Sequence, residues 1–140
     1  DKQGNLTAGT STGGMFKKRW GRIGDSPVIG AGTYADNNSC AVSCTGHGEY
    51  FIRHAVAFDV CARYKYLKES VEKAADYIIH TELNTNAGNG GLIAVDKLGN
   101  IAMPYNSGGM FRGFLYKEKG SPEIKKGCGI GKKIVVVGEK

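Results

Sequence analysis

Residues 9–48 read GTSTGGMFKKRWGRIGDSPVIGAGTYADNNSCAVSCTGHG, and the rest of the chain is arranged around them. Their first part has the pattern of a strand that ends in the hydroxyl side chains of Thr10, Ser11 and Thr12. Their last part is a strand of small residues, CAVSC at 40–44, that runs through TGHG into a helix. Glycines flank Arg22 and Asp25 between these parts. Hydroxyls, one charge of each sign and a helix N-terminus are the components of a pocket for a small zwitterion.

The junction between the second strand and the helix offers donors to an anion. A helix that begins near Gly48 leaves its first backbone N–H groups unpaired and its positive dipole end exposed. Gly46 and Gly48 let a ligand approach the backbone, and Thr45 adds a hydroxyl. The pattern predicts an anion site or an oxyanion hole. The alternative is an ordinary glycine-rich helix entry that Thr45 caps.

Arg22 and Asp25 form the second candidate feature. The glycines before and between them free the backbone, so that both side chains can face one point. An arginine holds a carboxylate through two parallel N–H bonds, and an aspartate accepts from an ammonium group. The pair therefore suits the α-carboxylate and α-amine of an amino acid. The alternative is a surface ion pair worth about 0–1 kcal/mol.

Two similar turns predict where strands pair. DKLGN at 96–100 lies between the apolar runs GLIAV and IAM, which is the pattern of a β-hairpin. DKQGN at 1–5 resembles it, and by analogy it also joins two strands, the second being residues 6–12. The first of those strands is not in the sequence. We therefore expect that the fragment begins one strand too late.

Helical periodicity appears twice after residue 48. One helix is expected from Glu49, with its apolar positions at Ile52, Ala55, Val56, Val60 and Tyr64. A second is expected over 69–83, with an apolar face made of Val71, Ala74, Ala75, Ile78 and Ile79. Further strands are expected at 111–116 and 133–138. The sequence thus predicts a single α+β domain over 1–140, in which helices pack on one face of a sheet.

Composition narrows the class of protein. The net charge of +6 admits a nucleic-acid-binding module, but the basic residues are scattered and no nucleic-acid motif occurs, so we expect no nucleic-acid partner. No apolar run approaches the roughly 20 residues that span a bilayer, so we expect no membrane partner. The four cysteines have neither metal-site nor disulfide-scaffold spacing. We expect no metal, no cofactor and a reducing, cytoplasmic setting.

The order TSTGG, GRIGDSP, GAGTYAD and TGHGE resembles the β-subunit of plant-type L-asparaginase/isoaspartyl peptidase. That family belongs to the N-terminal-nucleophile (Ntn) hydrolases and is made as a precursor that cuts itself, which frees a threonine at the start of the β-subunit. The resemblance covers nearly the whole chain and is strongest over residues 10–49. It implies an αββα sandwich, of which this chain is half, and a dimer of αβ protomers.

The resemblance also implies a role for each matching residue. Thr12 would orient the nucleophile, and Thr45 with the Gly46 N–H would form the oxyanion hole. Arg22 and Asp25 would bind the α-carboxylate and α-amine of the aspartyl group. The substrate-binding positions are Arg22, Ile23, Gly24, Asp25, Thr45, Gly46, His47 and Gly48. The implied reaction releases L-aspartate from L-asparagine and from β-aspartyl dipeptides.

The sequence departs from the family pattern at the nucleophile. The family's nucleophilic threonine opens the strand expected before Asp1, and Thr7, Thr10 and Thr12 cannot replace it because none has a free α-amine. The α-subunit is not in the chain either, so we expect residues 1–140 alone to be inactive. Two alternatives stay open: an N4-glycosylasparaginase, and a non-catalytic amino-acid-binding pseudoenzyme.

Overall fold

A computed structural model describes residues 1, 3–117, 124–130 and 135–138. The chain forms two compact units, Asp1–Asn106 and Ser107–Lys140. Both helices and strands are present, as the α+β prediction requires. The prediction that residues 1–140 form one domain stays a prediction.

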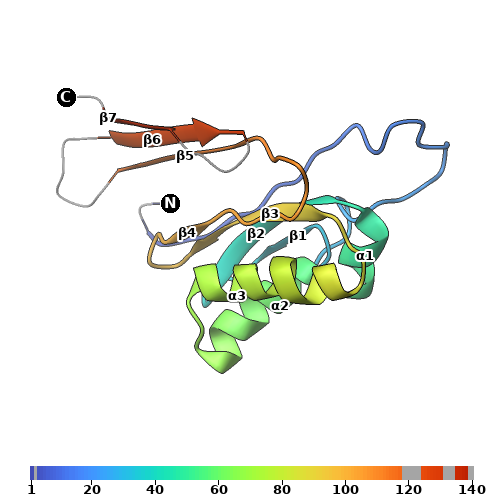
Figure 1. The fold of residues 1–140 in the computed structure, drawn as a ribbon. Helices are drawn as coiled ribbons and strands as arrows, with labels where there is room; N and C mark the ends of the chain where they lie inside the picture. Colours follow the sequence, from blue (N-terminus) through green and yellow to red (C-terminus); the bar gives the residue numbers. More distant parts are fainter. Residues whose placement is uncertain (2, 118–123, 131–134, 139–140) are drawn as a thin grey trace. The chain divides into compact units, whose positions relative to one another are not determined.

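The first unit contains a four-stranded antiparallel sheet in the order β1-β2-β3-β4. Its strands are β1 (Thr33–Ala35), β2 (Cys40–Gly46), β3 (Gly90–Asp96) and β4 (Ile101–Ala102). Between β2 and β3 the chain forms α1 (Gly48–Arg53), α2 (Val56–Ala62), α3 (Val71–Tyr77) and two π-helical segments, η1 (Arg63–Leu67) and η2 (Ile78–Leu83). The helices cover one face of this sheet (Figure 1).

The core lies between β2, β3 and the helices. Val42 and Leu92 contribute from the strands, and Phe51, Val60 and Ile79 from the helical segments, each at most 1% exposed. Burying one such side chain stabilises the fold by about 1.5–3 kcal/mol. Because this layer fixes the position of β2 against α1, it also fixes the junction between them.

The predicted second helix and its apolar face are confirmed. Residues 71–83 are helical, first as α3 and then as η2. All five predicted apolar positions are buried: Val71, Ala74, Ala75, Ile78 and Ile79. Ser70 caps the helix, because its hydroxyl accepts the Lys73 N–H at 3.2 Å. The spacing of apolar residues was enough to predict this helix, because its apolar face packs against one sheet.

The first helix was predicted as continuous, and this is wrong. It is broken between α1 and α2 at Ala55, whose φ of 45° lies in the left-handed region. That conformation costs an alanine about 1–2 kcal/mol. The N–H groups of Ala57 and Phe58 donate to the carbonyls of Ala31 and Gly30 at 3.1 and 2.8 Å. These tertiary hydrogen bonds cap the start of α2, and periodicity cannot reveal them.

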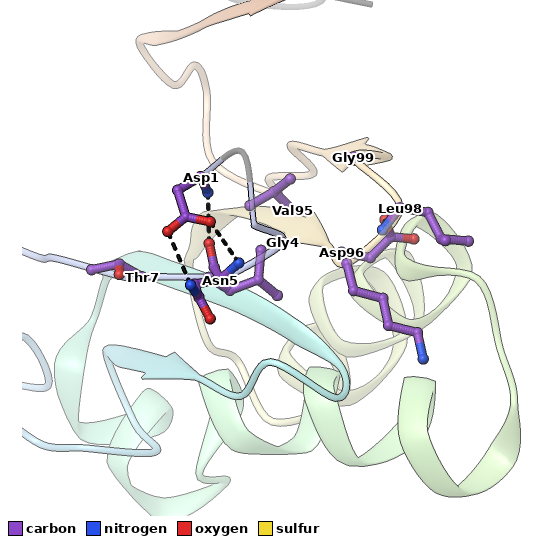
Figure 2. Close-up of a pocket in the computed structure, with 10 residues that line it drawn as sticks. Asp1, Gly4, Asn5, Thr7, Val95, Asp96, Leu98 and Gly99 are labelled. Atoms are coloured by element: carbon purple, nitrogen blue, oxygen red, sulfur yellow. Dashed lines mark hydrogen bonds between the residues drawn. The ribbon is translucent and has the colours of Figure 1, made fainter. Parts of the chain in front are cut away.

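The hairpin predicted from DKLGN is confirmed as β3 and β4. Residues 1–5 and 96–100 have the same internal bonding: in each, the first aspartate accepts the N–H groups two and four positions later at 2.8–2.9 Å. The glycine at the fourth position has a φ of 84° in one turn and 89° in the other. Residues of both turns line one groove of about 550 Å³, and Figure 2 shows them as sticks.

The strand predicted over residues 6–12 is not formed, and this prediction is wrong for the structure described. The segment lacks a backbone ladder and is held by side chains. The Leu6 N–H donates to Asn37 Oδ1 at 2.8 Å, and the Thr10 hydroxyl lies 2.7 Å from Ser43 Oγ. A β-propensity pattern specifies a strand only where a partner strand supplies the second half of the ladder.

The second unit contains a three-stranded antiparallel sheet in the order β5-β6-β7. Its strands are β5 (Arg112–Lys117), β6 (Ile124–Gly129) and β7 (Val135–Gly138). The prediction of a strand at 111–116 is confirmed. For the strand predicted at 133–138, residues 133 and 134 lie outside the described residues. Strands β6 and β1 were not predicted, because β6 is rich in lysine and glycine and β1 is only three residues long.

No helix in the described part of the chain has the length and apolar character needed to cross a membrane.

Candidate active site

The site begins where β2 passes into α1. Thr45, Gly46 and His47 are exposed there, whereas Gly48 is buried as the first residue of α1. His47 is the residue before the helix, and its side chain makes no capping hydrogen bond. Its backbone N–H donates to the Asn89 carbonyl at 2.8 Å. The alternative of an entry capped by Thr45 is therefore wrong, because His47 occupies the capping position.

Only glycine fits at position 46. Its φ is 148°, and an added Cβ would collide with the Asn89 carbonyl oxygen and lie 2.7 Å from the Gly90 Cα. Gly90, its partner across β2 and β3, is equally confined by the Thr45 carbonyl and by the Phe51 ring. Two strands thus approach each other with no side chain between them. This contact fixes the backbone at Thr45 and Gly46.

The register of β2 and β3 sets the direction of the Gly46 N–H group. In an antiparallel pair, alternate residues point their N–H groups toward the partner strand. His47 bonds to Asn89, and Cys44 turns its N–H the other way, to the Gly32 carbonyl at 2.9 Å. Gly46 lies two positions after Cys44, so the N–H groups of these two residues point in the same direction. Its N–H therefore points away from β3, beside the exposed Thr45.

Arg22 and Asp25 meet at the same junction. The Arg22 Nη2 lies 2.9 Å from Glu49 Oε2, in the first turn of α1, and the two side chains are 33% and 49% exposed. Asp25 is only 5% exposed and packs against Gly48, where an added Cβ would lie 2.7 Å from Asp25 Oδ1. The structure therefore brings the predicted pair to the helix entry. The alternative, a surface ion pair between Arg22 and Asp25, does not form, because Arg22 pairs with Glu49.

The Asp25 carboxylate is incompletely satisfied. Its Oδ2 is buried and has no hydrogen-bond partner among the described residues. Burial raises the pKa of Asp25, and the backbone N–H of Asp25 itself, the Arg22 cation and the Ser26 N–H oppose that rise only in part. An unpaired buried acceptor costs about 1–3 kcal/mol. A ligand with a cationic donor would recover that cost.

Thr12 stands apart from these residues in the structure. It is exposed, and its hydroxyl accepts the Gly14 N–H at 2.9 Å. Two positions earlier, Thr10 contacts Ser43, which lies two positions before Thr45 on β2. Residues 5–10 run alongside the chain from Asn37 to Ser43, in the direction of β2, so that the chain at Thr12 continues toward the Thr45 end.

The comparison with known proteins assigns the chain to a family. A model of the asparaginase family matches residues 1–124. The chain belongs to the asparaginase family. This confirms the resemblance found from the TSTGG, GRIGDSP, GAGTYAD and TGHGE motifs.

Individual relatives agree with the family. The chain is 53% identical to an isoaspartyl peptidase of Salmonella typhimurium over 116 residues, which cover 83% of this chain and 37% of that protein. It is 48% identical to an isoaspartyl peptidase of Escherichia coli over 130 residues, covering 86% and 40% of the two chains. It is 51% identical to the probable isoaspartyl peptidase/L-asparaginase 2 of Arabidopsis thaliana over 113 residues, covering 81% and 34%. The chain thus spans 34–40% of the length of these members of the asparaginase family.

The remaining predicted positions surround the Arg22 and Asp25 pair. The Ile23 side chain is 70% exposed. Gly24 lies against the Arg22 guanidinium, because an added Cβ would be 3.4 Å from its Nη1. The His47 ring is exposed and lies 6.3 Å from the Tyr50 ring, measured between centroids. Their roles as substrate-binding residues in this asparaginase-family chain stay predictions.

Sequence reasoning missed three residues that support the site. Glu49, which was predicted as the start of a helix and closes the TGHGE motif, is the partner of Arg22. Asn89 and Asn106 hold the segment beside Gly46. The dense Asn and Gly content of residues 84–90 is typical of a loop and does not show where the loop is attached. Since the attachments join residues more than fifteen positions apart, no local pattern in the sequence contains them.

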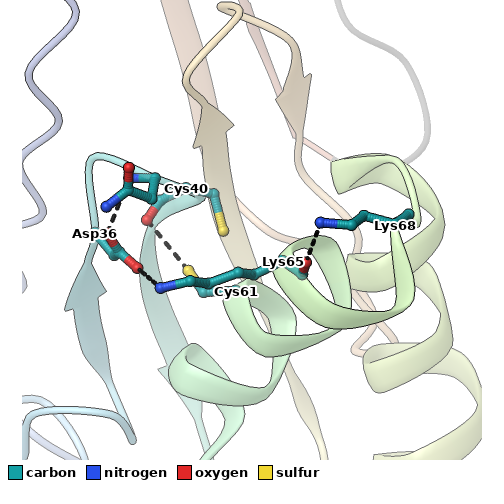
Figure 3. A network of polar contacts seen from close by, with 6 residues as sticks. Asp36, Cys40, Cys61, Lys65 and Lys68 are labelled. Carbon is teal, nitrogen blue, oxygen red and sulfur yellow. Dashed lines mark hydrogen bonds and ion pairs between the residues drawn. The ribbon is translucent and has the colours of Figure 1, made fainter.

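A polar network surrounds Cys40, at the start of β2, whereas Thr45 lies near the end of that strand (Figure 3). The Lys65 ammonium lies 2.9 Å from Asp36 Oδ2, and the Cys61 thiol donates to the Cys40 carbonyl at 3.1 Å. The contact with Cys61 and burial raise the pKa of Cys40, and burial raises that of Cys44. These thiols stay protonated and act as small apolar side chains.

Proposed function

We propose that this chain is the substrate-binding part of a hydrolase that releases L-aspartate from L-asparagine and from β-aspartyl dipeptides. The observation that carries the proposal is the buried Oδ2 of Asp25, which has no hydrogen-bond partner in the part of the chain that the structure describes and lies at the entry of α1. An aspartyl group carries the complementary charges, an ammonium for Asp25 and a carboxylate for Arg22. The names of the relatives, isoaspartyl peptidase and isoaspartyl peptidase/L-asparaginase, support the same substrates.

Glu49 takes part in substrate binding indirectly. It already holds one terminal nitrogen of Arg22, whose guanidinium has further N–H groups on its other edge. An incoming α-carboxylate accepts from that other edge while Glu49 keeps the guanidinium in plane. Gly24 leaves this edge uncovered by a side chain. Ile23, His47 and Gly48 then line the remainder of the aspartyl pocket.

Thr45 and Gly46 stabilise the charge that develops during the reaction. A threonine hydroxyl attacks the side-chain carbonyl carbon, a C–O bond forms, and the carbonyl oxygen becomes an oxyanion. The Thr45 hydroxyl and the Gly46 N–H donate to that oxygen. The C–N bond then breaks, and the leaving ammonia or amine takes the proton that the base removed from the hydroxyl. Water hydrolyses the resulting ester and releases aspartate.

The attacking group is a threonine whose free α-amine serves as the base, and no threonine of residues 1–140 occupies such a position. We propose that it comes from outside this chain after cleavage of a precursor, with Thr12 orienting it. Residues 1–140 then form a β-subunit domain that is inactive alone and active with an α-subunit.

The wider assembly is proposed on the same basis. Helices on one face of the β1–β4 sheet, with Ile93 on the other face 44% exposed, suit one layer pair of an αββα sandwich. The proposal of a dimer of αβ protomers rests on the family resemblance alone.

The cellular location is a separate proposal. The buried free thiols of Cys40, Cys44 and Cys61 support a reducing, cytoplasmic location.

The test uses the complete gene product that carries this chain. Mass spectrometry should find two pieces, the second with an N-terminal threonine upstream of Asp1. Aspartate release is then measured with L-asparagine, a β-aspartyl dipeptide and a glycosylasparagine. We expect turnover of the first two substrates. An uncut chain without turnover would indicate the pseudoenzyme, and turnover of the glycosylasparagine alone would indicate a glycosylasparaginase.

A further inference from the structure

Asn106 makes an unusually complete set of hydrogen bonds at the end of the first unit. Its Nδ2 donates to the Gly88 carbonyl at 2.8 Å, and to Ile79 O and Asn84 Oδ1 at 3.3 and 3.2 Å. Its Oδ1 accepts the Gly90 N–H at 2.8 Å. Its backbone N–H donates to the Gly90 carbonyl at 2.9 Å. One side chain therefore joins the first turn of η2, the residues Asn84 and Gly88 that follow η2, and the first residue of β3.

These bonds lead directly to the Thr45–Gly46 pair. Asn106 holds both backbone groups of Gly90. Gly90 in turn packs on the Thr45 carbonyl and the Gly46 Cα, with no room for a Cβ on either glycine. The residue before Gly90, Asn89, accepts the His47 N–H. A shift of Gly90 would thus move the backbone on both sides of the Gly46 N–H.

We propose that Asn106 is a positioning residue for the oxyanion site formed by Thr45 and Gly46. The inference rests on the proposed function for the site, and it adds a residue that contacts neither substrate nor oxyanion. Asn106 acts through Gly90, and it fixes the direction of two donors that must converge on one oxygen. A misplacement of about 1 Å at such a site costs about 100-fold in rate.

The chemistry of the side chain explains why an asparagine is needed. The nitrogen faces three oxygen acceptors, whereas the oxygen faces one N–H donor. A neutral amide has an N–H donor group and an oxygen acceptor in one plane, whereas a carboxylate of the same shape has acceptors only. In Asn106→Asp, the oxygen that replaces the nitrogen would face the three acceptors, and a carboxylate there is repelled. Protonation restores one donor, so that the defect depends on pH.

The experiment compares Asn106→Asp with Asn100→Asp in the complete protein. Asn100 is a matched control, because its Nδ2 donates to Asp96 Oδ2 at 2.8 Å in a turn away from Thr45 and Gly46. We expect Asn106→Asp to lower kcat for L-asparagine by about 10- to 100-fold with KM within about twofold. The ratio of variant to wild-type kcat should rise as the pH falls. Asn100→Asp should lower the melting temperature and leave kcat unchanged.

A second measurement does not depend on activity. Amide hydrogen exchange at His47 should be faster in Asn106→Asp and unchanged in Asn100→Asp, because the Asn89 carbonyl loses its support. The proposal is overturned if Asn106→Asp keeps wild-type kcat, if its kcat loss equals that of Asn100→Asp, or if His47 exchange does not change. A wild-type protein without turnover would refute the proposed function, and the exchange comparison would still decide whether Asn106 supports His47. If Asn106→Asp does not fold, Asn106→Gln, which keeps both polarities on a longer stem, is measured in the same way.

Discussion

The two halves of the candidate site are built in different ways. Thr45 and Gly46 are fixed by backbone: two strands meet without side chains, and Asn106 holds the neighbouring residue. Arg22 and Asp25 are fixed by side chains: one ion pair to Glu49, and one carboxylate packed against Gly48. The backbone half presents a Gly46 N–H whose direction is set by the strands, beside the Thr45 side chain. The side-chain half presents charges whose positions depend on single contacts, so the two halves should respond differently to mutation.

The largest effect should come from Gly46→Ala. The new Cβ would collide with backbone atoms of Asn89 and Gly90 at a φ of 148°, so we expect the protein to lose about 3 kcal/mol or more of its free energy of unfolding. Urea unfolding of the complete protein measures this. Gly13→Ala is the control, because nothing lies within 4 Å of an added Cβ there, and it should change stability by less than about 0.5 kcal/mol. Equal effects of the two variants would show that the strands do not meet as described.

Thr45→Val should affect the rate and not the binding of substrate. Valine keeps the branched shape of threonine and removes the hydroxyl, so we expect kcat to fall about 100- to 1000-fold with little change in KM. Thr45→Ser, which keeps the hydroxyl, should retain most of the rate. Steady-state kinetics with L-asparagine distinguishes the two. A rise in KM without loss of kcat would assign Thr45 to the side-chain half of the site.

Arg22→Ala should affect the binding of substrate and not the rate, which is the opposite of Thr45→Val. Loss of a charge-assisted bond of about 1.5–3 kcal/mol raises KM about 10- to 100-fold. The control is Arg19→Ala, an exposed arginine three positions earlier in the same segment, which should leave KM unchanged. The measurement is KM for L-asparagine and for a β-aspartyl dipeptide. If kcat falls and KM does not, Arg22 contributes to the reaction and the contrast between the halves is lost.

Asp25→Asn should stabilise the protein while it weakens binding. Because burial raises the folded-state pKa of Asp25 above its ordinary value of 3.8, the folded protein binds more protons than the unfolded chain between these two pKa values. Wild-type stability therefore falls as the pH rises through that window. Asparagine does not titrate, so the variant should be more stable than the wild type at pH 7 and should lose this advantage as the pH falls to 3.8. Thermal unfolding at several pH values measures it, and a variant less stable at pH 7 would contradict the argument.

The parts of the molecule whose structure depends on residues close together in the sequence could be predicted. The apolar face from Val71 to Ile79 follows the helical period, and the DKLGN turn fixes a hairpin through its own aspartate. The motif order predicted the family. By contrast, the break at Ala55, the missing ladder over residues 6–12 and the pairing of Arg22 with Glu49 all depend on contacts between distant segments. Periodicity and propensity describe one segment at a time and do not include such contacts.

The sequence by itself determined which chemical groups are present. These are the hydroxyl of Thr45, a glycine without a side chain at position 46, and side chains of opposite charge at positions 22 and 25. The tertiary structure decided what they face. It buried Asp25 with one oxygen that no described residue contacts by a hydrogen bond, turned the Gly46 N–H away from β3, and attached Gly90 to Asn106. The physical reason is that residue type sets the donors, acceptors and charges, whereas their direction and solvation are set by the strands and helices that pack around them.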